Sequence, residues 1–243
     1  MSRPLLGAPT LVFAHRGDRL RAPDNTLDAY MLAVDAGTDG IELDVRRTRD
    51  GILILSHDDH VPGLEPFASL GFEVVRELAP QVPTLREAMN LIPRHIFVNV
   101  EIKNFSFDAG YDENRMIVDQ TIAELREYDD PSRIIMSSFD PLSVQRVGEV
   151  GSEFLRGQLL LAVFPLDAGI AVSQDLEVDA VIPHLSHLKD DPVGTMDQIR
   201  EADLATIVWG VDTDEEIELM GAHGVDIIIT DDPGRAKELL NQA

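Results

Sequence analysis

Residues 40–45 read GIELDV and residues 96–103 read IFVNVEIK, and these two stretches decide the fold. Successive residues of a β-strand point to opposite faces, so Glu42 and Asp44 share one face while aliphatic side chains take the other. In the second stretch aliphatic residues again alternate with polar ones, namely Asn99, Glu101 and Lys103. Both stretches therefore predict strands with one apolar and one charged face, and buried carboxylates call for a cation beside them.

Outward from these stretches, short aliphatic runs alternate with helical patterns along the chain. Nine runs predict strands: Thr10–Ala14, Gly40–Val45, Ile52–Leu55, Ile96–Ile102, Arg133–Ser137, Gln158–Val163, Asp179–Ile182, Ala205–Trp209 and Asp226–Thr230. Taking Ile52–Leu55 as an extra strand beside the second leaves eight strands, most of them followed by a helix. In a chain of 243 residues this alternation favours an α/β fold of the (β/α)8 TIM-barrel type. An open doubly wound sheet is the alternative, but no Gly-x-Gly-x-x-Gly follows a strand.

Helix starts are marked between the predicted strands. Thr84 with Glu87, and Thr213 with Glu216, have the spacing of capping boxes ahead of apolar helical patterns. Residues 58–83 have a weak period and contain two internal prolines, Pro62 and Pro66. We therefore expect a single domain over residues 1–243, in which residues 58–83 form a loop or short insertion after the second strand.

The charge of the chain excludes several classes of partner. It carries 44 acidic and 20 basic residues, a formal net charge of −24, so it repels nucleic acid and anionic lipid. Such a surface suits an ordinary acidic protein or one adapted to high salt. The chain lacks cysteine, a signal-peptide segment and any apolar run near the ~18 residues of a membrane span. We therefore expect a cytoplasmic protein without a stable membrane anchor, and the sequence leaves homo-oligomerisation open.

Polar side chains follow the predicted strands one after another. His15 and Arg16 follow the first strand, His57 follows the extra strand, and Lys103 ends the third. The active sites of (β/α)8 barrels form where the carboxyl ends of the strands meet. An imidazole titrates near neutral pH, so His15 and His57 are the candidate general acid and base. Arg16 and Lys103 are cations suited to phosphate oxygens, which indicates an anionic, small-molecule phosphate ester as substrate.

Three carboxylates at the same end could hold a metal ion. Glu42, Asp44 and Glu101 offer hard oxygen ligands and no sulfur. This set favours one divalent cation, Mg²⁺ or Ca²⁺ with Mn²⁺ as a third candidate, over Zn²⁺. The alternative is that these carboxylates form salt bridges inside the barrel, with Arg46 and Lys103.

Three further residues near predicted strand ends are candidates for lining a substrate pocket: Phe139, His184 and Trp209. The alternative for each is packing at the end of the barrel. The remaining histidines carry no comparable signal, and we expect them to be structural or surface residues.

At these residues the sequence resembles the glycerophosphodiester phosphodiesterase family. The matching motifs, within a span from Phe13 to Pro233, are His15-Arg16-Gly17, Pro23-Asp24-Asn25-Thr26, Glu42-Leu43-Asp44-Val45, His57-Asp58 and Glu101-Ile102-Lys103. The resemblance implies a TIM barrel that cleaves glycerophosphodiesters to glycerol 3-phosphate and an alcohol. It also implies a divalent cation on the three carboxylates, acid/base roles for the two histidines, and phosphate contacts from Arg16 and Lys103.

Two departures from the family pattern bear on the substrate. Asp24 stands where the family usually has glutamate, and residues 58–83 lack the stretch that often follows the His-Asp motif. Lysophospholipase D-type cleavage of lysophospholipids is an alternative reaction, but the sequence shows no exposed aromatic cluster that would serve a long acyl chain. A barrel that binds phosphate esters without turnover is the non-enzymatic alternative, and retention of both histidines and all three carboxylates argues against it.

Overall fold

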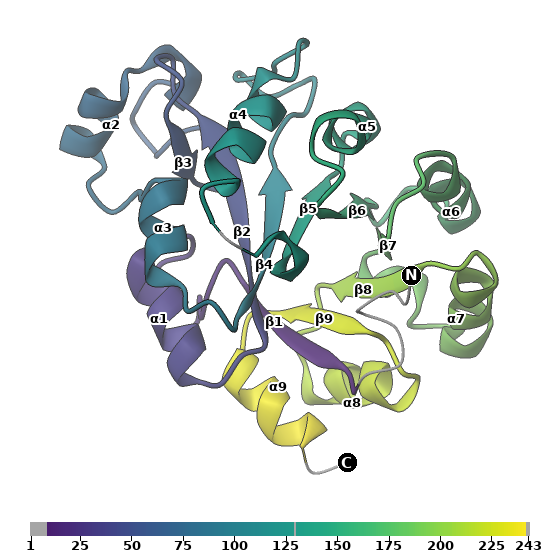
Figure 1. The fold of residues 1–243 in the computed structure, drawn as a ribbon. Helices are drawn as coiled ribbons and strands as arrows, with labels where there is room; N and C mark the ends of the chain where they lie inside the picture. Colours follow the sequence, from purple (N-terminus) through teal and green to yellow (C-terminus); the bar gives the residue numbers. More distant parts are fainter. Residues whose placement is uncertain (1–8, 129, 242–243) are drawn as a thin grey trace.

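The computed structural model describes residues 9–128 and 130–241, in which parallel strands are surrounded by helices (Figure 1). Within these residues eight strands form a barrel: β1 (Leu11–His15), β2 (Gly40–Arg47), β4 (Phe97–Ile102), β5 (Ile134–Ser138), β6 (Leu155–Leu159), β7 (Ala180–Ile182), β8 (Ala205–Trp209) and β9 (Ile227–Thr230). Each strand pairs in parallel with the next, and β9 pairs with β1, which closes the circle through β2. The predicted (β/α)8 barrel is confirmed.

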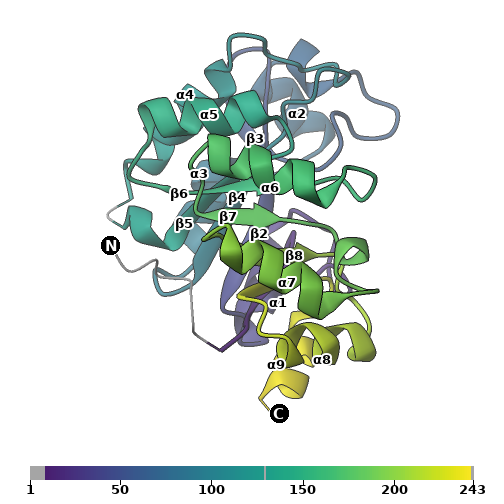
Figure 2. The ribbon, with the colours of Figure 1, turned by 90° about the vertical axis from the view of Figure 1, so that its right-hand side faces the viewer.

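The helices lie outside the barrel, and α5, α6 and α7 stand one beside the next in the side view (Figure 2). Their bounds are α1 (Leu27–Asp35), α2 (Phe72–Leu78), α3 (Leu85–Leu91), α4 (Met116–Leu125), α5 (Pro141–Val150), α6 (Leu166–Asp175), α7 (Pro192–Glu201), α8 (Asp214–Ala222) and α9 (Pro233–Leu240). The described residues also contain three 3₁₀ turns, which lie in connections between strands and helices: η1 (Phe67–Ser69), η2 (Pro131–Arg133) and η3 (Leu185–His187). Both predicted capping boxes are present, ahead of α3 and α8. None of the helices in the described part of the chain has the length and apolar composition needed to cross a membrane.

The extra strand predicted beside the second is β3 (Leu53–Leu55), and the structure shows that it pairs antiparallel with β2. The segment that follows carries η1 and α2, which the weak sequence period did not predict. Buried residues of this segment, among them Phe67 and Val75, pack with Ile54 of β3 in a small cluster of their own. The insertion is thus anchored on β3, next to the loop that carries His57.

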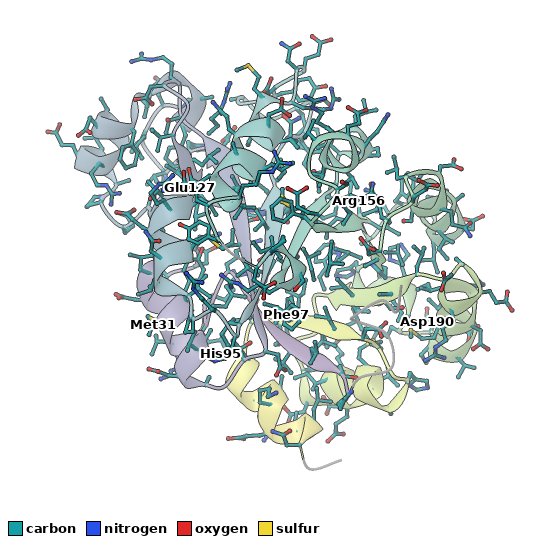
Figure 3. The ribbon with its side chains drawn as sticks, viewed as in Figure 1. Met31, His95, Phe97, Glu127, Arg156 and Asp190 are labelled. Atoms are coloured by element: carbon teal, nitrogen blue, oxygen red, sulfur yellow. The ribbon has the colours of Figure 1, made fainter. Side chains whose placement is uncertain are left out.

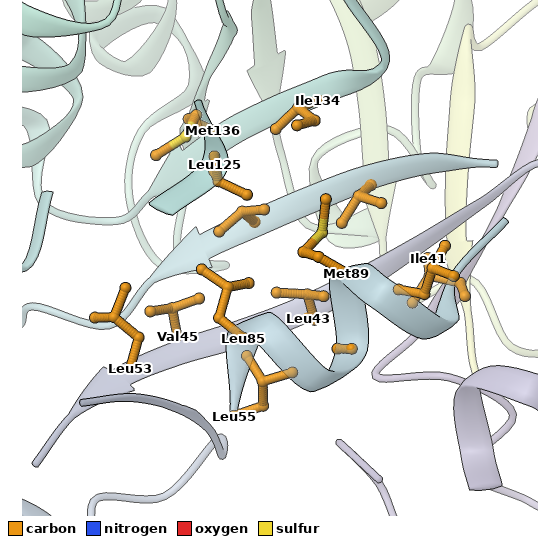
Figure 4. Packing of buried hydrophobic residues seen from close by; sticks show 14 of the residues in the cluster. Ile41, Leu43, Val45, Leu53, Leu55, Leu85, Met89, Leu125, Ile134 and Met136 are labelled. Atoms are coloured by element: carbon orange, nitrogen blue, oxygen red, sulfur yellow. The ribbon is translucent and has the colours of Figure 1, made fainter. Parts of the chain in front are cut away.

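The outer faces of the strands form a core with the helices. Leu85 and Met89 of α3 pack against Ile41, Leu43 and Val45 of β2 (Figure 4). These three β2 side chains are fully buried, and burying one such aliphatic side chain stabilises a protein by about 1.5–3 kcal/mol. This packing fixes the face of β2 that carries Ile41, so Glu42 and Asp44 point to the opposite side, into the barrel.

The inner face of the barrel changes character from its base to its mouth. At the amino ends of the strands Phe97 stacks on Phe13 with ring centroids 6.0 Å apart, and Figure 3 marks Phe97 among the strands. Two and four residues further along β4, the same face presents Asn99 and then Glu101. On the opposite wall the interior is apolar and includes Ile229. The barrel therefore has an apolar base, with a polar mouth on the side of β2 and β4.

One strand lies elsewhere than predicted. The apolar run at Gln158–Val163 predicts a strand, but β6 covers Leu155–Leu159 and the chain leaves the barrel at Leu160. Leu161 and Val163 are exposed in the loop that follows. Their apolar side chains therefore belong to this loop and not to the wall of the barrel.

Candidate active site

Three carboxylates from two adjacent strands meet at the carboxyl end of the barrel. The parallel register places Asp44 beside Glu101 and Glu42 beside Asn99. One oxygen from each of Glu42, Asp44 and Glu101 lies within 4.8 Å of the others, and all three residues are buried. Oε1 of Glu42 is buried without a hydrogen-bond partner among the described residues. Because hard divalent cations take several carboxylate oxygens, this donor set fits such an ion, and these three residues could hold it.

Burial and mutual repulsion of the carboxylates disfavour the charged form of Glu42 in this cluster. Burial raises the pKa of Glu42 well above its ordinary value, and the neighbouring charges of Asp44 and Glu101 raise it further. Burial acts in the same direction on Asp44, but Lys103 and Arg16 outweigh it and lower the pKa of that carboxyl. A cation among the three carboxylates would remove the repulsion that Glu42 experiences.

The two predicted phosphate-binding cations lie beside this cluster. Nζ of Lys103 lies 2.7 Å from Oε1 of Glu101 and 3.3 Å from Oδ1 of Asp44. Nε of Arg16 lies 3.1 Å from Oδ2 of Asp44. Both cations are mostly buried, and Arg16 and Lys103 line the same cavity as Glu42 and Glu101. The salt bridge to Lys103, given above as an alternative to a metal site, is present and coexists with the carboxylate cluster.

The turn after β1 holds Arg16 in place through its backbone. Arg16 has a left-handed φ of 58°, and its N–H donates to Oε2 of Glu42 at 3.0 Å. Its Nη1 donates to Oδ2 of Asp24 at 3.1 Å, which gives the aspartate at this departure from the family pattern a direct contact in the site. The next residue, Gly17, has φ 86°, and a Cβ there would lie 2.6 Å from the backbone of Ala29. Only glycine therefore permits the close packing of this turn against α1.

Each candidate catalytic histidine is hydrogen-bonded to an aspartate. Nδ1 of His15 lies 2.7 Å from Oδ1 of Asp231, and Nδ1 of His57 lies 2.8 Å from Oδ1 of Asp58. Both histidines line the cavity, and burial is the main cause that lowers the pKa of His57. Arg46 donates to the carbonyl of His57 from Nε and Nη2, at 3.0 and 2.6 Å. The alternative in which Arg46 forms a salt bridge with the carboxylate cluster is therefore wrong, because this guanidinium binds the carbonyl of His57 and pairs with Asp108.

The cavity has a volume of about 590 Å³ and two unlike walls. One wall carries the histidines, cations and carboxylates, and the other is apolar, with Phe105, Phe107, Phe139, Leu159, Leu161 and Trp209. The candidate lining residues Phe139 and Trp209 are thus in the cavity wall, in an edge-to-face contact at 5.9 Å. His184 lies outside the lining, with its ring 4.5 Å from that of Trp209, and its Nδ1 accepts a hydrogen bond at the start of η3.

Apolar side chains are also exposed in the two loops after β4 and β6, which contribute Phe107 and Leu161 to the lining of the cavity. Four of them are exposed, and we call this set the apolar rim: Phe107, Leu161, Val163 and Phe164. Phe107 is 79% exposed and Val163 is 90% exposed. The sequence showed no exposed aromatic cluster, whereas in the structure Phe107 and Phe164 are exposed. The sequence did not predict the apolar rim because its residues come from two loops that are far apart in the chain.

One residue of the site carried no role in the sequence analysis. Asn25 is buried with a left-handed φ of 53°, and its Nδ2 donates to Oδ2 of Asp44 at 2.7 Å. Its Oδ1 accepts from the hydroxyl of Tyr30 at 2.9 Å and from the backbone N–H of Asp44 at 3.2 Å. Asn25 therefore fixes both the strand position and the carboxylate of Asp44. An asparagine in a loop tolerates the left-handed region, but that signal alone names no partner.

A closed (β/α)8 barrel with an acidic, histidine-flanked cavity at the carboxyl ends of its strands defines the chain as a TIM-barrel enzyme. The model of the glycerophosphoryl diester phosphodiesterase family matches residues 15–235. The chain belongs to this family, which confirms the resemblance seen in the sequence and excludes the non-enzymatic alternative.

Several relatives match along nearly their whole length. The glycerophosphodiester phosphodiesterase of Caldanaerobacter subterraneus subsp. tengcongensis is 32% identical over 240 residues, which cover 92% of this chain and 95% of that protein. The solved structure of the Thermotoga maritima glycerophosphodiester phosphodiesterase has a TM-score of 0.80 at 22% identity, covering 95% of this chain and 98% of that one. An Oleispira antarctica phosphodiesterase, solved with its product sn-glycerol-3-phosphate, has a TM-score of 0.82 at 21% identity, covering 95% and 96%. At these identities the two structures support the fold.

Proposed function

We propose that this enzyme hydrolyses glycerophosphodiesters to glycerol 3-phosphate and an alcohol, with a divalent cation on Glu42, Asp44 and Glu101. The observation that carries the proposal is the group of three carboxylate oxygens within 4.8 Å, in a cavity that two histidines also line. Membership of the family supports the reaction. The product bound by the Oleispira antarctica relative supports glycerol 3-phosphate as the product here.

The chain's own cations bind and orient the phosphate. Arg16 presents a planar guanidinium to the cavity and Lys103 an ammonium group, and both suit phosphate oxygens. Both are held by Asp44, so the carboxylate keeps the two positive groups in position. A divalent cation on the carboxylates would add positive charge to offset the negative charge that develops on the phosphoryl oxygens.

His15 and His57 exchange the protons of the reaction. Asp231 and Asp58 occupy Nδ1 of these rings, which leaves Nε2 of each to accept or donate a proton. One imidazole takes the proton of the attacking oxygen and the other gives a proton to the departing alcohol. A contribution of about 10²–10⁴-fold is typical of such groups, so both are required for rapid turnover.

A phosphodiester panel with metal removal tests the proposal. Glycerophosphocholine, glycerophosphoethanolamine and bis(p-nitrophenyl) phosphate are assayed after EDTA treatment and after return of Mg²⁺, Ca²⁺ or Mn²⁺. We expect glycerol 3-phosphate from the first two substrates, loss of activity with EDTA and recovery with at least one ion. Full activity in EDTA would refute the metal requirement, and failure to release glycerol 3-phosphate would refute the reaction.

The apolar rim favours one second candidate substrate. Phe107 and Leu161 belong both to the rim and to the cavity wall, so the apolar surface continues from the cavity to the outside. This surface would accept the acyl chain of a lysophospholipid, cleaved as by a lysophospholipase D. Product analysis with lysophosphatidylcholine decides: release of lysophosphatidic acid supports this candidate, and release of no product excludes it.

A further inference from the structure

One buried side chain in the cavity has polar atoms that find no hydrogen-bond partner in the described part of the chain. Asn99 is 1% exposed, lies on the inner face of β4 and lines the cavity. Neither its Oδ1 nor its Nδ2 makes a hydrogen bond within the described residues. The register sets Asn99 beside Glu42 and one layer below the Asp44–Glu101 pair, at the floor of the site.

A buried amide in this state lowers the stability of the protein. Buried polar groups are nearly always hydrogen-bonded, and each unpaired donor or acceptor carries the full cost of its lost hydration. An apolar side chain of the same shape would avoid that cost. Features of this kind concentrate in ligand-binding sites, where the ligand supplies the missing partners.

The chemistry of the amide restricts what the partner is. Nδ2 must donate and Oδ1 must accept, so the missing partner must offer both an acceptor and a donor, in one group or in two neighbouring groups. A phosphate oxygen without a proton only accepts, and a metal ion takes only the carbonyl oxygen. A hydroxyl group meets both requirements, and hydroxyl groups are what distinguishes the glycerol half of a glycerophosphodiester from its phosphate.

We propose, resting on the function given above, that Asn99 is a specificity-determining residue whose amide binds a hydroxyl of the substrate's glycerol. The glycerol then lies at the floor of the cavity, below the Asp44–Glu101 pair. The departing alcohol extends toward the mouth, where the apolar wall includes Phe139 and Trp209.

Two substrates separate this role from a general one in catalysis. The variant Asn99→Leu, close in shape, is assayed on glycerophosphocholine and on methyl p-nitrophenyl phosphate, which has no hydroxyl group. We expect kcat/KM on glycerophosphocholine to fall about 10- to 100-fold, the loss typical of a removed hydrogen-bonding group. Activity on methyl p-nitrophenyl phosphate and the midpoint of a metal titration followed by calorimetry should stay within about 2-fold.

The Tm of the variant is a second readout, because a structural role of Asn99 would make Asn99→Leu lower the Tm. We expect the Tm of Asn99→Leu to equal or exceed that of the wild type, because an unpaired buried amide is removed. Thr206→Val is the matched control: Thr206 is buried with an unpaired hydroxyl, but it lies on β8 and outside the cavity lining. It should likewise keep its Tm, and both activities should be unchanged. Asn99→Ala repeats the test if the larger side chain prevents folding.

Several results would overturn the proposal. Equal losses on both substrates would assign Asn99 to the catalytic step, and a shifted metal titration would make it a ligand of the cation. Unchanged activity on glycerophosphocholine would remove it from the site. If the wild type cleaves methyl p-nitrophenyl phosphate but not glycerophosphocholine, the proposed function fails, and that result is distinct from any behaviour of the variants.

Discussion

Replacing Asn25 should destabilise the protein far more than loss of one loop residue normally does. The amide of Asn25 makes three hydrogen bonds, two with Asp44 and one with the hydroxyl of Tyr30. Asn25→Gly removes all three but keeps a residue that adopts the left-handed φ. Asp44 and Tyr30 are buried, and a buried group left without its partner costs about 1–3 kcal/mol. We therefore expect a loss of about 3–5 kcal/mol in the free energy of unfolding.

Two companion variants divide this loss into its parts. Tyr30→Phe removes a single hydrogen bond and should cost about 1 kcal/mol. Asn25→Ala loses the same three bonds as Asn25→Gly and adds the strain of a Cβ in the left-handed region, about 1–2 kcal/mol. In an ordinary conformation alanine is more stable than glycine, by about 0.5–1 kcal/mol in a helix or strand. Here we expect alanine to be equally or more destabilising.

Urea unfolding followed by circular dichroism measures these differences, with kcat/KM and a metal titration on the same samples. Both Asn25 variants should also weaken metal binding, because the carboxylate of Asp44 loses the amide that orients it. If Asn25→Gly unfolds within about 0.5 kcal/mol of the wild type, the amide does not hold β2, and the reasoning is wrong. Loss of stability with unchanged metal affinity would refute only the link to Asp44.

Three further predictions concern the catalytic and capping residues. His15→Ala and His57→Ala should each lower kcat about 10²–10⁴-fold with the fold intact by circular dichroism, and unchanged metal-dependent turnover would remove that histidine from catalysis. Glu101→Gln should weaken divalent metal binding and reduce the rise in Tm that the metal gives the wild type, whereas an unaltered titration would exclude Glu101 from the ligand set. Burial raises the pKa of Glu87, but hydrogen bonds from Thr84 and from a neighbouring guanidinium outweigh it, and the net pKa is lowered. The stability that Glu87 contributes is therefore present above its pKa in the unfolded chain, about 4.3, and is lost as the pH falls through its pKa in the folded protein. The difference in the free energy of unfolding between wild type and Glu87→Gln should therefore shrink from pH 6 to pH 3.

The sequence was sufficient for the parts of this protein that local pattern controls. Strand alternation at Glu42 and Asp44 fixes which side chains enter the barrel, because the opposite face must pack against helices. The capping boxes at Thr84 and Thr213 involve residues only three positions apart, so they are legible without the fold.

What the sequence could not supply depends on contacts across the chain or on unusual backbone. The partners of Arg46 follow from how the His57 loop turns back over β2, which no spacing encodes. The contacts of Asn25 depend on its left-handed φ. The shifted β6 has a different cause. The strand β6 includes Gly157, which has no apolar side chain. The apolar residues that resemble a continued strand, such as Val163, lie exposed in the loop that follows.

The position of His57 has a consequence for how this enzyme could diversify. His57 follows β3, which pairs with β2, has one further bridge from Ile54 to Thr84, and lies outside the eight-strand circle. The tilt and stagger of the eight barrel strands therefore do not depend on the length and composition of the segment attached to β3. Insertions, deletions or whole exchanges of residues 58–83 would reshape the approach to one imidazole while the closed framework keeps its geometry. Residues 58–83 are therefore a segment in which substrate preference could change with little disturbance of the barrel, and a suitable segment to exchange in protein engineering.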